Sequence, residues 1–514
     1  MSYNGADALA DVLIENGIKV CFSNPGTTEM HLVAALTRDG RIANHLCLFE
    51  GVATGAADGY ARMSGRPAAT LLHLGPGLAN GLANLHNARK AAMPVLNIVG
   101  EHAVAHIAHD APLTSDIAGL AGPVSKTVAT LTEPADIARV TGDLLRDIQS
   151  GVKGIGTLIM PNDVAWSEAA PDNQPAIEIP SLDAPDPAAV SQAAKALQTP
   201  GAYLLLGAPH ITRRMQELAQ AIAAKTGATL LAEAATARCS RGGGLPGLAR
   251  IPFQIDAAIA TLEGAKQAVL AGARAPVAFF AYPERPSALL PETCEITTLC
   301  PAEADVETAL SVLADELDAS IAEPQKLALP PIPTGPITPE ALGAAVANGL
   351  PENAIVADES VTNGTSLYPA CASAPAHDWL NNRGGSIGYG MPLAIGCAAA
   401  CPNRPVLAVI GDGSASYTLQ ALWTMARAGM NITVLILSNR RYKILSNEMS
   451  KIGAGEPDEN SDPLMDLGNP SIGWVALAEG YGVAARQVSE ATELRKAISL
   501  AMATPGPFLI EAVM

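Results

Sequence analysis

The sequence Val406-Leu407-Ala408-Val409-Ile410-Gly411-Asp412-Gly413-Ser414 decides the fold of the C-terminal third of this chain. A second apolar run, 432–437, follows about two dozen residues later and ends at Ser438 and Asn439. This spacing predicts two parallel strands joined by a right-handed crossover, which brings the carboxyl ends of both strands to one edge of the sheet. We therefore expect Asp412 and Asn439 to lie close together at that edge.

The residue types at this edge suit a metal ion and a phosphate group. Asp412 and Asn439 offer oxygen ligands for Mg²⁺, which usually joins protein carboxylates to phosphate oxygens. Gly411 and Gly413 allow close approach of the backbone to a diphosphate, and Ser414 opens a helix whose first amides favour anions. For Gly-Asp-Gly alone, a short turn with an Asp cap is the alternative. The Asn at crossover distance favours the metal site.

A second pattern lies in the N-terminal third. The apolar segment 45–49 ends at Glu50, and a helix-like run of small residues follows over 51–62. An acid at a strand end, between Phe49 and Gly51, would be poorly hydrated and therefore chemically distinctive. A Glu that only stabilises a helix N-terminus is the other interpretation of these residues.

The two patterns together resemble thiamine diphosphate (ThDP) enzymes of the 2-oxo acid decarboxylase and acetolactate synthase group, and within it most the benzoylformate decarboxylases. The resemblance is carried by Gly-Asp-Gly with Asn439, by the segment Gly55–Ala61 and by Gly75-Pro76-Gly77 with Asn80. It covers nearly the whole chain. It implies an α/β fold of three consecutive doubly wound domains with mostly parallel sheets.

The expected domain boundaries follow two segments rich in proline, at 170–186 and 329–336. They give a pyrimidine-binding domain at 1–168, a middle domain at 186–322 and a diphosphate-binding domain at 338–514. The length of 514 residues suits about three domains of the usual ~100–200 residues each. In the middle segment, the glycines of 242–247 do not follow an apolar strand, so we interpret them as a loop and not as a dinucleotide motif.

The resemblance assigns roles by position. Glu50 would hydrogen-bond the pyrimidine ring of ThDP and promote loss of its C2 proton, and Mg²⁺ would be held by Asp412, Asn439 and the main-chain carbonyl of Arg441. The Gly385 carbonyl would accept from the cofactor's amino group, and Ile387 would wedge between its two rings. The expected cofactor-binding residues are Glu50, Asn80, Ser360, Thr362, Gly385, Ile387, Gly411, Asp412, Gly413, Ser414 and Asn439. Positions that depart from the family's patterns include Ser438, Val361, Leu445 and Glu448, the last in place of an aromatic residue of the benzoylformate decarboxylases.

Decarboxylation needs a group that transfers a proton near neutral pH, for which histidine is the usual choice. His73 corresponds to an active-site histidine of benzoylformate decarboxylases, and Thr27 to a hydroxyl that contacts the substrate carboxylate. His109 corresponds to the first histidine of a catalytic pair in pyruvate decarboxylases, with Asp110 in place of the second. For each histidine, a structural or surface role is the alternative.

The resemblance therefore implies Mg²⁺-dependent, non-oxidative decarboxylation of a 2-oxo acid through a C2 ylide and an enamine. An acetolactate synthase-like carboligase is the alternative, and a non-catalytic ThDP-binding homologue is a further one. FAD in the middle domain is possible but not favoured. The family also implies self-association, as a homodimer or a dimer of dimers such as a homotetramer, with active sites between subunits.

Composition narrows the partners and the compartment. The net charge of −18 argues against nucleic acid or an anionic membrane surface as a binding partner, because both bind clustered positive charge. The N-terminus lacks a basic region followed by an apolar core, so we expect no secretory signal. The eight cysteines form no C-x-x-C pattern, which indicates free thiols and argues against a zinc site. We expect a cytoplasmic protein.

Overall fold

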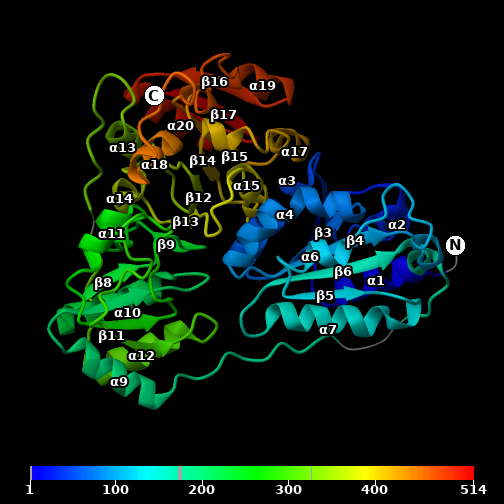
Figure 1. Ribbon diagram of the computed structural model, residues 1–514, viewed down its shortest axis with the longest axis horizontal. Helices are drawn as coiled ribbons and strands as arrows, with labels where there is room; N and C mark the ends of the chain where they lie inside the picture. The colour runs from blue at the N-terminus through cyan, green and yellow to red at the C-terminus, as the bar shows by residue number, and fades with distance from the viewer. Residues whose placement is uncertain (1–2, 172–175, 326) are drawn as a thin grey trace.

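The computed structural model describes residues 3–171, 176–325 and 327–514, and these residues form three sheets (Figure 1). The strand orders are β2-β1-β3-β4-β6-β5, β11-β10-β7-β8 and β16-β17-β15-β14-β12-β13-β9. Within the described residues, every pair of neighbouring strands is parallel except β9 with β13. The predicted α/β fold with mostly parallel sheets is confirmed. None of the helices in these ranges is both long and apolar enough to cross a membrane.

The first sheet belongs to the N-terminal unit. Its four inner strands, β1, β3, β4 and β6, are buried, as parallel strands covered by helices require, whereas the edge strands β2 and β5 are partly exposed. The strands are β1 Val20–Asn24, β2 Ala43–Leu46, β3 Ala68–Leu72, β4 Val95–Glu101, β5 Thr127–Thr130 and β6 Ile155–Pro161. The helices are α1 Gly5–Glu15, η1 Thr27–Glu29, α2 Met30–Thr37, α3 Glu50–Ser64, α4 Leu74–Lys90, α5 Val104–Ile107, α6 Ile117–Ala121, η2 Pro134–Asp136, α7 Ile137–Gln149 and α8 Asn162–Trp166.

The second sheet lies in the middle unit, which follows the first proline-rich segment. Residues 172–175 of that segment lie outside the described residues. The strands are β7 Ala202–Leu206, β8 Thr229–Ala232, β10 Gln267–Ala271 and β11 Glu295–Cys300, and the helices are α9 Pro187–Leu197, α10 Arg213–Thr226, α11 Ile255–Leu262 and α12 Val306–Glu316. The glycines of 242–244 form a turn with positive φ, as the loop interpretation predicted.

The third sheet is the largest, and it takes one strand from the middle segment. Strand β9, Cys239–Arg241, pairs antiparallel with β13, so this short piece packs with the third sheet. The sequence analysis did not predict it, because three residues carry no periodic signal. The other strands are β12 Ala354–Glu359, β13 His377–Asn381, β14 Val406–Gly411, β15 Ile432–Ser438, β16 Ala484–Val488 and β17 Phe508–Val513. The helices are α13 Pro339–Gly349, α14 Leu367–Ala370, η3 Cys371–Ser373, α15 Gly390–Ala400, α16 Asp412–Ala415, α17 Ala421–Ala428, α18 Lys443–Lys451, η4 Asp462–Leu464, α19 Trp474–Gly480 and α20 Ala491–Ala503.

Helices α3 and α15 join the first and third units by direct backbone contact (Figure 1). A Cβ on Gly59 would lie 2.1 Å from the Leu393 carbonyl oxygen, and one on Gly396 would lie 1.9 Å from the Ala56 carbonyl oxygen. Only glycine permits this approach. The small residues of the segment Gly55–Ala61 therefore serve helix packing.

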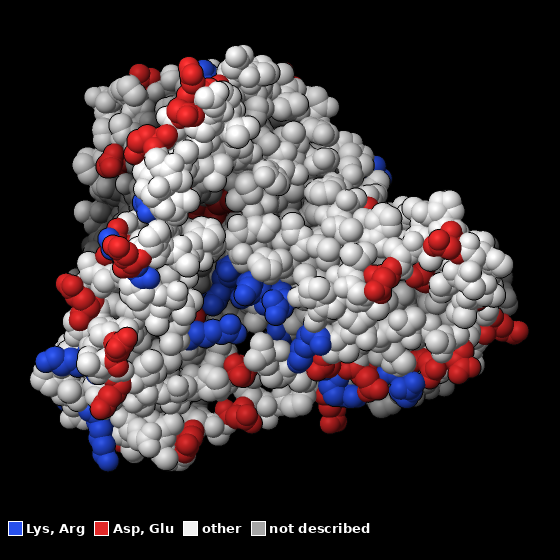
Figure 2. All heavy atoms as spheres, in the orientation of Figure 1, with Lys and Arg blue, Asp and Glu red and all other residues white. Residues whose placement is uncertain are grey.

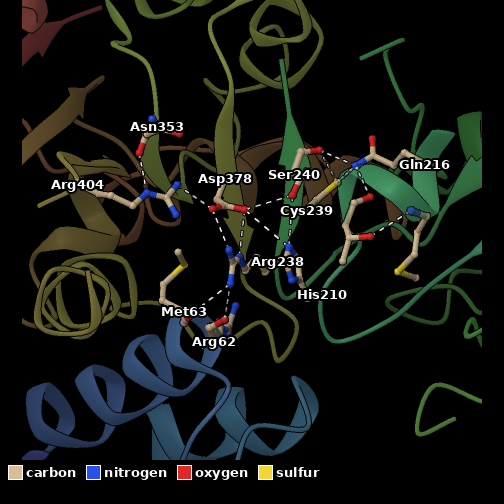
Figure 3. Close-up of polar contacts among 12 residues, drawn as sticks. Arg62, Met63, His210, Gln216, Arg238, Cys239, Ser240, Asn353, Asp378 and Arg404 are labelled. Carbon is tan, nitrogen blue, oxygen red and sulfur yellow. Dashed lines mark hydrogen bonds and ion pairs between the residues drawn. The ribbon is translucent and has the colours of Figure 1, made fainter. Parts of the chain in front are cut away.

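Buried ion pairs connect all three units around Asp378 on β13 (Figure 3). Its carboxylate pairs with Arg238 at 3.0 Å and with Arg404 at 2.7 Å. Burial alone would raise the pKa of Asp378, but the hydrogen bonds and charges of the two arginines hold it below its usual value. Arg238 also donates to the carbonyls of Arg62 and Met63 at the end of α3. The cluster thus fixes α3 against the third sheet.

Candidate active site

Asp412 and Asn439 lie at the same edge of the third sheet, as predicted. Strands β14 and β15 are neighbours, with Gly411 opposite Leu437. The Asp412 carboxylate accepts the backbone N–H of Arg440 at 2.6 Å, and the Asn439 side-chain oxygen accepts that of Arg441 at 3.0 Å. The loop after β15 therefore folds over the start of α16.

This edge fits a magnesium diphosphate. A Cβ on Gly411 would meet no atom within 4 Å, so the backbone before Asp412 borders open space. Burial raises the pKa of Asp412, although amide hydrogen bonds from Arg440 and Gly413 oppose the shift. No cluster of three or more His, Cys, Asp or Glu side chains suited to a metal occurs in the described ranges. A metal held here would take one carboxylate, one amide oxygen and a backbone carbonyl, the oxygen ligands that Mg²⁺ prefers.

The neighbouring strand end, after β12, carries the two expected hydroxyl residues. The Ser360 hydroxyl is buried and donates to Asp358 at 2.6 Å, while Thr362 is half-buried. Between them, Val361 has φ of +47°. A β-branched residue in the left-handed region is strained. Because the Ser360 hydroxyl already donates to Asp358, the Thr362 hydroxyl is the better placed of the two to bind a phosphate oxygen.

Glu50 and His73 both lie beside Gly77 near the edge of the first sheet. Glu50 begins α3, is buried and accepts a hydrogen bond from the Asn80 side chain at 3.0 Å. A Cβ on Gly77 would lie 3.4 Å from Glu50 Oε1 and 3.4 Å from the His73 Cβ. The two predicted catalytic residues therefore border the same glycine, which lies in the first turn of α4.

A buried acid that sequence reasoning missed holds the His73 ring. Glu29 Oε2 lies 2.8 Å from His73 Nδ1, and the Glu29 side chain has no exposed surface. Thr28 Oγ1 lies 3.3 Å from the same ring nitrogen. A carboxylate at Nδ1 fixes the orientation of an imidazole and leaves Nε2 for proton transfer. The sequence signal for Glu29 was an acid in the turn after β1.

Thr27 and His109 lie apart from this contact. Thr27 is exposed, and it is the adjacent Thr28 that reaches His73. His109 is exposed on the loop after α5, and its ring packs near His106, with centroids 5.8 Å apart. Among the described residues, no side-chain hydrogen bond or ion pair links Thr27 or His109 to Glu50. Their proposed catalytic roles stay predictions.

Backbone strain independently marks the candidate site. Outside glycine, positive φ occurs directly beside four predicted site residues: at Leu74 after His73, at Asp110 after His109, at Val361 after Ser360 and at Arg440 after Asn439. Such conformations cost about 1–3 kcal/mol each and cluster at functional sites. The other four such residues in the described ranges, Ala92, Glu284, Asp318 and Asn353, adjoin no predicted site residue, so the strain agrees with the candidate site but does not define it.

The segment 384–388 joins the two edges within the chain. The Asn84 side chain on α4 donates to the carbonyl of Gly51 at 2.7 Å and to that of Gly388 at 3.4 Å. Asn87 exchanges hydrogen bonds with the backbone of Ser386. The residues Gly385 and Ile387, expected to hold the cofactor's rings, therefore lie on a segment that contacts the helix after His73.

Aromatic residues of the middle unit cover this segment. A Cβ on Gly385 would lie 2.6 Å from the Phe279 ring, and Phe253 and Phe280 pack against that ring with centroids 4.9 and 4.7 Å away. Nearby, the Tyr282 hydroxyl donates to Glu448 of α18 at 2.7 Å. The middle unit thus contributes apolar surface beside the candidate site.

A separate basic hollow lies between the N-terminal and middle units (Figure 2). The cavity there is about 500 Å³, and Lys90, Arg238, Arg274 and Arg383 are among its lining residues. It lies at the carboxyl ends of β7 and β10, whereas Glu50 and Asp412 do not line it. The expectation about FAD in the middle unit stays a prediction, which a visible absorption spectrum of the purified protein tests.

Comparisons with protein families and solved structures agree with this geometry. Residues 3–120 match the thiamine pyrophosphate enzyme, N-terminal TPP binding domain, and residues 360–512 match its C-terminal TPP binding domain. The second match contains Asp412 and Asn439, and the first contains Glu50 and His73. The fold is also that of a solved Rhodococcus jostii RHA1 thiamine diphosphate-dependent 4-hydroxybenzoylformate decarboxylase, with a TM-score of 0.85, 24% identity and 99% of each chain covered.

Two curated relatives span the full chain. The "Putative acetolactate synthase large subunit IlvX" of Mycobacterium tuberculosis is 46% identical, with 99% of each chain covered. The benzoylformate decarboxylase of Pseudomonas aeruginosa is 28% identical, over 98% of this chain and 97% of that protein. The chain therefore belongs to the thiamine pyrophosphate enzymes, in the family that includes acetolactate synthases and 2-oxo acid decarboxylases.

Proposed function

We propose that this protein removes CO₂ from a 2-oxo acid without oxidation and releases an aldehyde. The observation that carries the proposal is that Glu50 Oε1 and the His73 Cβ each lie 3.4 Å from the position that a Cβ on Gly77 would take. Two proton-transferring groups at one place suit a reaction that must first remove a proton and later deliver one. The contact of Glu29 with His73 Nδ1 supports delivery of a proton by His73, because it leaves Nε2 available.

Bound ThDP would supply the electron sink for the negative charge left by loss of CO₂, which no side chain provides. Asp412, Asn439 and the Arg441 carbonyl would bind Mg²⁺ and, through it, the diphosphate. Glu50 would hold and return a proton at the pyrimidine ring. His73 would deliver a proton to the product carbon through Nε2.

The aromatic residues beside Gly385 bear on the choice of substrate. Phe253, Phe279 and Phe280 are each about half exposed, and they form an apolar patch beside the expected cofactor segment. Burial of apolar surface contributes about 25 cal/mol per Å². We propose that the preferred 2-oxo acid has a bulky apolar side chain such as an aryl group.

A carboligase of the acetolactate synthase kind is the second candidate, and the 46% identity to the M. tuberculosis protein over the whole chain favours it. Product analysis with pyruvate and with benzoylformate separates the two. CO₂ with free aldehyde supports the decarboxylase, and faster turnover of benzoylformate supports the aryl preference. A coupled hydroxy-oxo acid as the main product would overturn the first proposal in favour of the second.

We also propose self-association, with the site completed between subunits, as the family resemblance implies. Half-exposed apolar side chains near both sheet edges, Leu48, Val361 and Tyr417, support an interface there. Coexpression of Glu50→Gln and Asp412→Ala chains tests the arrangement. Sites shared between subunits restore about a quarter of wild-type activity in the mixture, because half of the dimers are mixed and each has one intact site. Sites confined to one chain restore none.

A further inference from the structure

Glu359 is a buried acid without a role in the site as described so far. It ends β12 and is 4% exposed. Its Oε1 accepts the backbone N–H of Gly388 at 2.6 Å and of Tyr389 at 3.3 Å, and its Oε2 accepts that of Gly390 at 2.8 Å. In the described part of the chain, no basic side chain lies within ion-pair distance of it. Three successive amides are therefore its direct partners.

The electrostatic surroundings make this placement costly. Burial and, less strongly, the negative charge of Asp358 raise the pKa of Glu359 to about 7, although the three amide hydrogen bonds oppose the shift. Burial and the negative charges of Asp358 and Glu359 raise the pKa of the Tyr389 hydroxyl, and the charge of Arg62 opposes that shift. A buried carboxylate without a cation is retained only where its hydrogen bonds are well made.

The amides that Glu359 holds belong to the segment of the expected cofactor contacts. Gly385 and Gly388 have φ of +82° and +88°, so this backbone turns twice through the left-handed region. The Thr418 hydroxyl donates to the Gly388 carbonyl at 3.0 Å from the other side. A Cβ on Gly390 would lie 2.9 Å from Glu359 Oε2. The carboxylate packs directly on the backbone, and no side chain intervenes.

We propose that Glu359 is a positioning residue, whose ionised carboxylate fixes the amides of 388–390 and thereby the placement of the Gly385 carbonyl and the Ile387 side chain. The inference rests on the proposed function, because that function gives this segment its role. A displacement of about 1 Å at a reacting centre can cost 100-fold in rate. Glu359 therefore acts through the segment and does not itself contact the reacting atoms.

The first test uses the cofactor-free protein. Glu359→Gln keeps the size of the side chain but replaces one accepting oxygen with an NH₂ group, which cannot accept an amide proton. At about pH 8, where Glu359 is mostly ionised, peptides that cover 385–390 should exchange their amide hydrogens about 10-fold faster in this variant. Glu511→Gln, at a buried acid on β17, is the matched control and should leave these peptides unchanged. Equal protection in Glu359→Gln and wild type would overturn the inference.

The second test uses the loaded protein. Glu359→Gln should slow exchange of the cofactor's C2 proton and turnover by about 10- to 100-fold, with ThDP affinity changed less than about threefold, because the metal edge is separate. If Glu359→Gln does not fold, Glu359→Asp keeps the charge, shortens the reach and should act in the same direction. Wild-type protein that never binds ThDP contradicts the proposed function. If wild-type protein and both variants bind ThDP and exchange its C2 proton at equal rates, this inference is contradicted and the proposed function is not.

Discussion

The two sheet edges of the candidate site are built in different ways. At the third sheet, Asp412 and Asn439 are held by backbone amides: Asp412 accepts those of Gly413 and of Arg440, 28 residues away, and Asn439 accepts that of Arg441. At the first sheet, His73 is held by Glu29, and Glu50 by Asn80, through side chains far apart in sequence. The metal edge is thus held mainly by backbone amides, and the proton-transfer edge by contacts between side chains.

This difference predicts that the two edges fail differently on substitution. Glu50→Gln should lower turnover by about 10²- to 10⁴-fold, the usual contribution of a general acid–base group, and should leave ThDP and Mg²⁺ bound. The measurement is the rate of CO₂ release beside a calorimetric titration, with Glu511→Gln as the control. Unchanged turnover would contradict the catalytic role of Glu50 and would support the alternative of a non-catalytic ThDP-binding homologue.

The tertiary dependence of the first edge extends to the far end of α3. Arg62 is buried, pairs with Asp58 at 2.6 Å and donates to the carbonyls of Ala237 and Asn381. Arg62→Ala should lower the free energy of unfolding by about 3–5 kcal/mol, because it leaves a buried carboxylate unpaired. Urea denaturation checks this. The exposed pair of Arg139 with Asp136 is the control, and Arg139→Ala should cost less than about 1 kcal/mol.

Glu359 gives the third unit a pH-dependent stability of its own. Its pKa is about 7 in the folded protein and 4.5 when exposed, so the folded state binds more protons between these values. The free energy of unfolding should therefore fall as pH rises from 4.5 to 7, by on the order of 3 kcal/mol from this group. Comparison of unfolding curves at several pH values, with Glu359→Gln beside wild type, isolates the contribution. An equal slope in both proteins would contradict it.

The smallest expected effect concerns the His73 partner. Glu29→Gln keeps a hydrogen-bonding group near Nδ1 but removes its charge, so turnover should fall by about 10-fold with a shifted pH profile. Thr28→Val, which removes the longer 3.3 Å contact, should change turnover by less than about threefold. A larger effect of Thr28→Val than of Glu29→Gln would show that Thr28, and not Glu29, positions His73.

How much the sequence could predict follows the same division. The proximity of Asp412 and Asn439 was predictable, because a right-handed crossover between neighbouring strands leaves one possible edge. The Gly55–Ala61 segment was predictable as a helix, but its packing against α15 was not, since nothing in its own sequence identifies the facing glycines. Glu29 was missed for the related reason that its partner lies 44 residues away. Strand β9 was too short to show periodicity.

The central claim is that one ThDP and one Mg²⁺ bind where Asp412 and Asn439 meet, within reach of Glu50. Calorimetric titration of the purified protein with ThDP, with and without Mg²⁺, tests it most directly. We predict about one ThDP per chain, bound only with Mg²⁺ and lost in Asp412→Ala. Absence of binding in the presence of Mg²⁺, or equal binding by wild type and Asp412→Ala, would contradict the account.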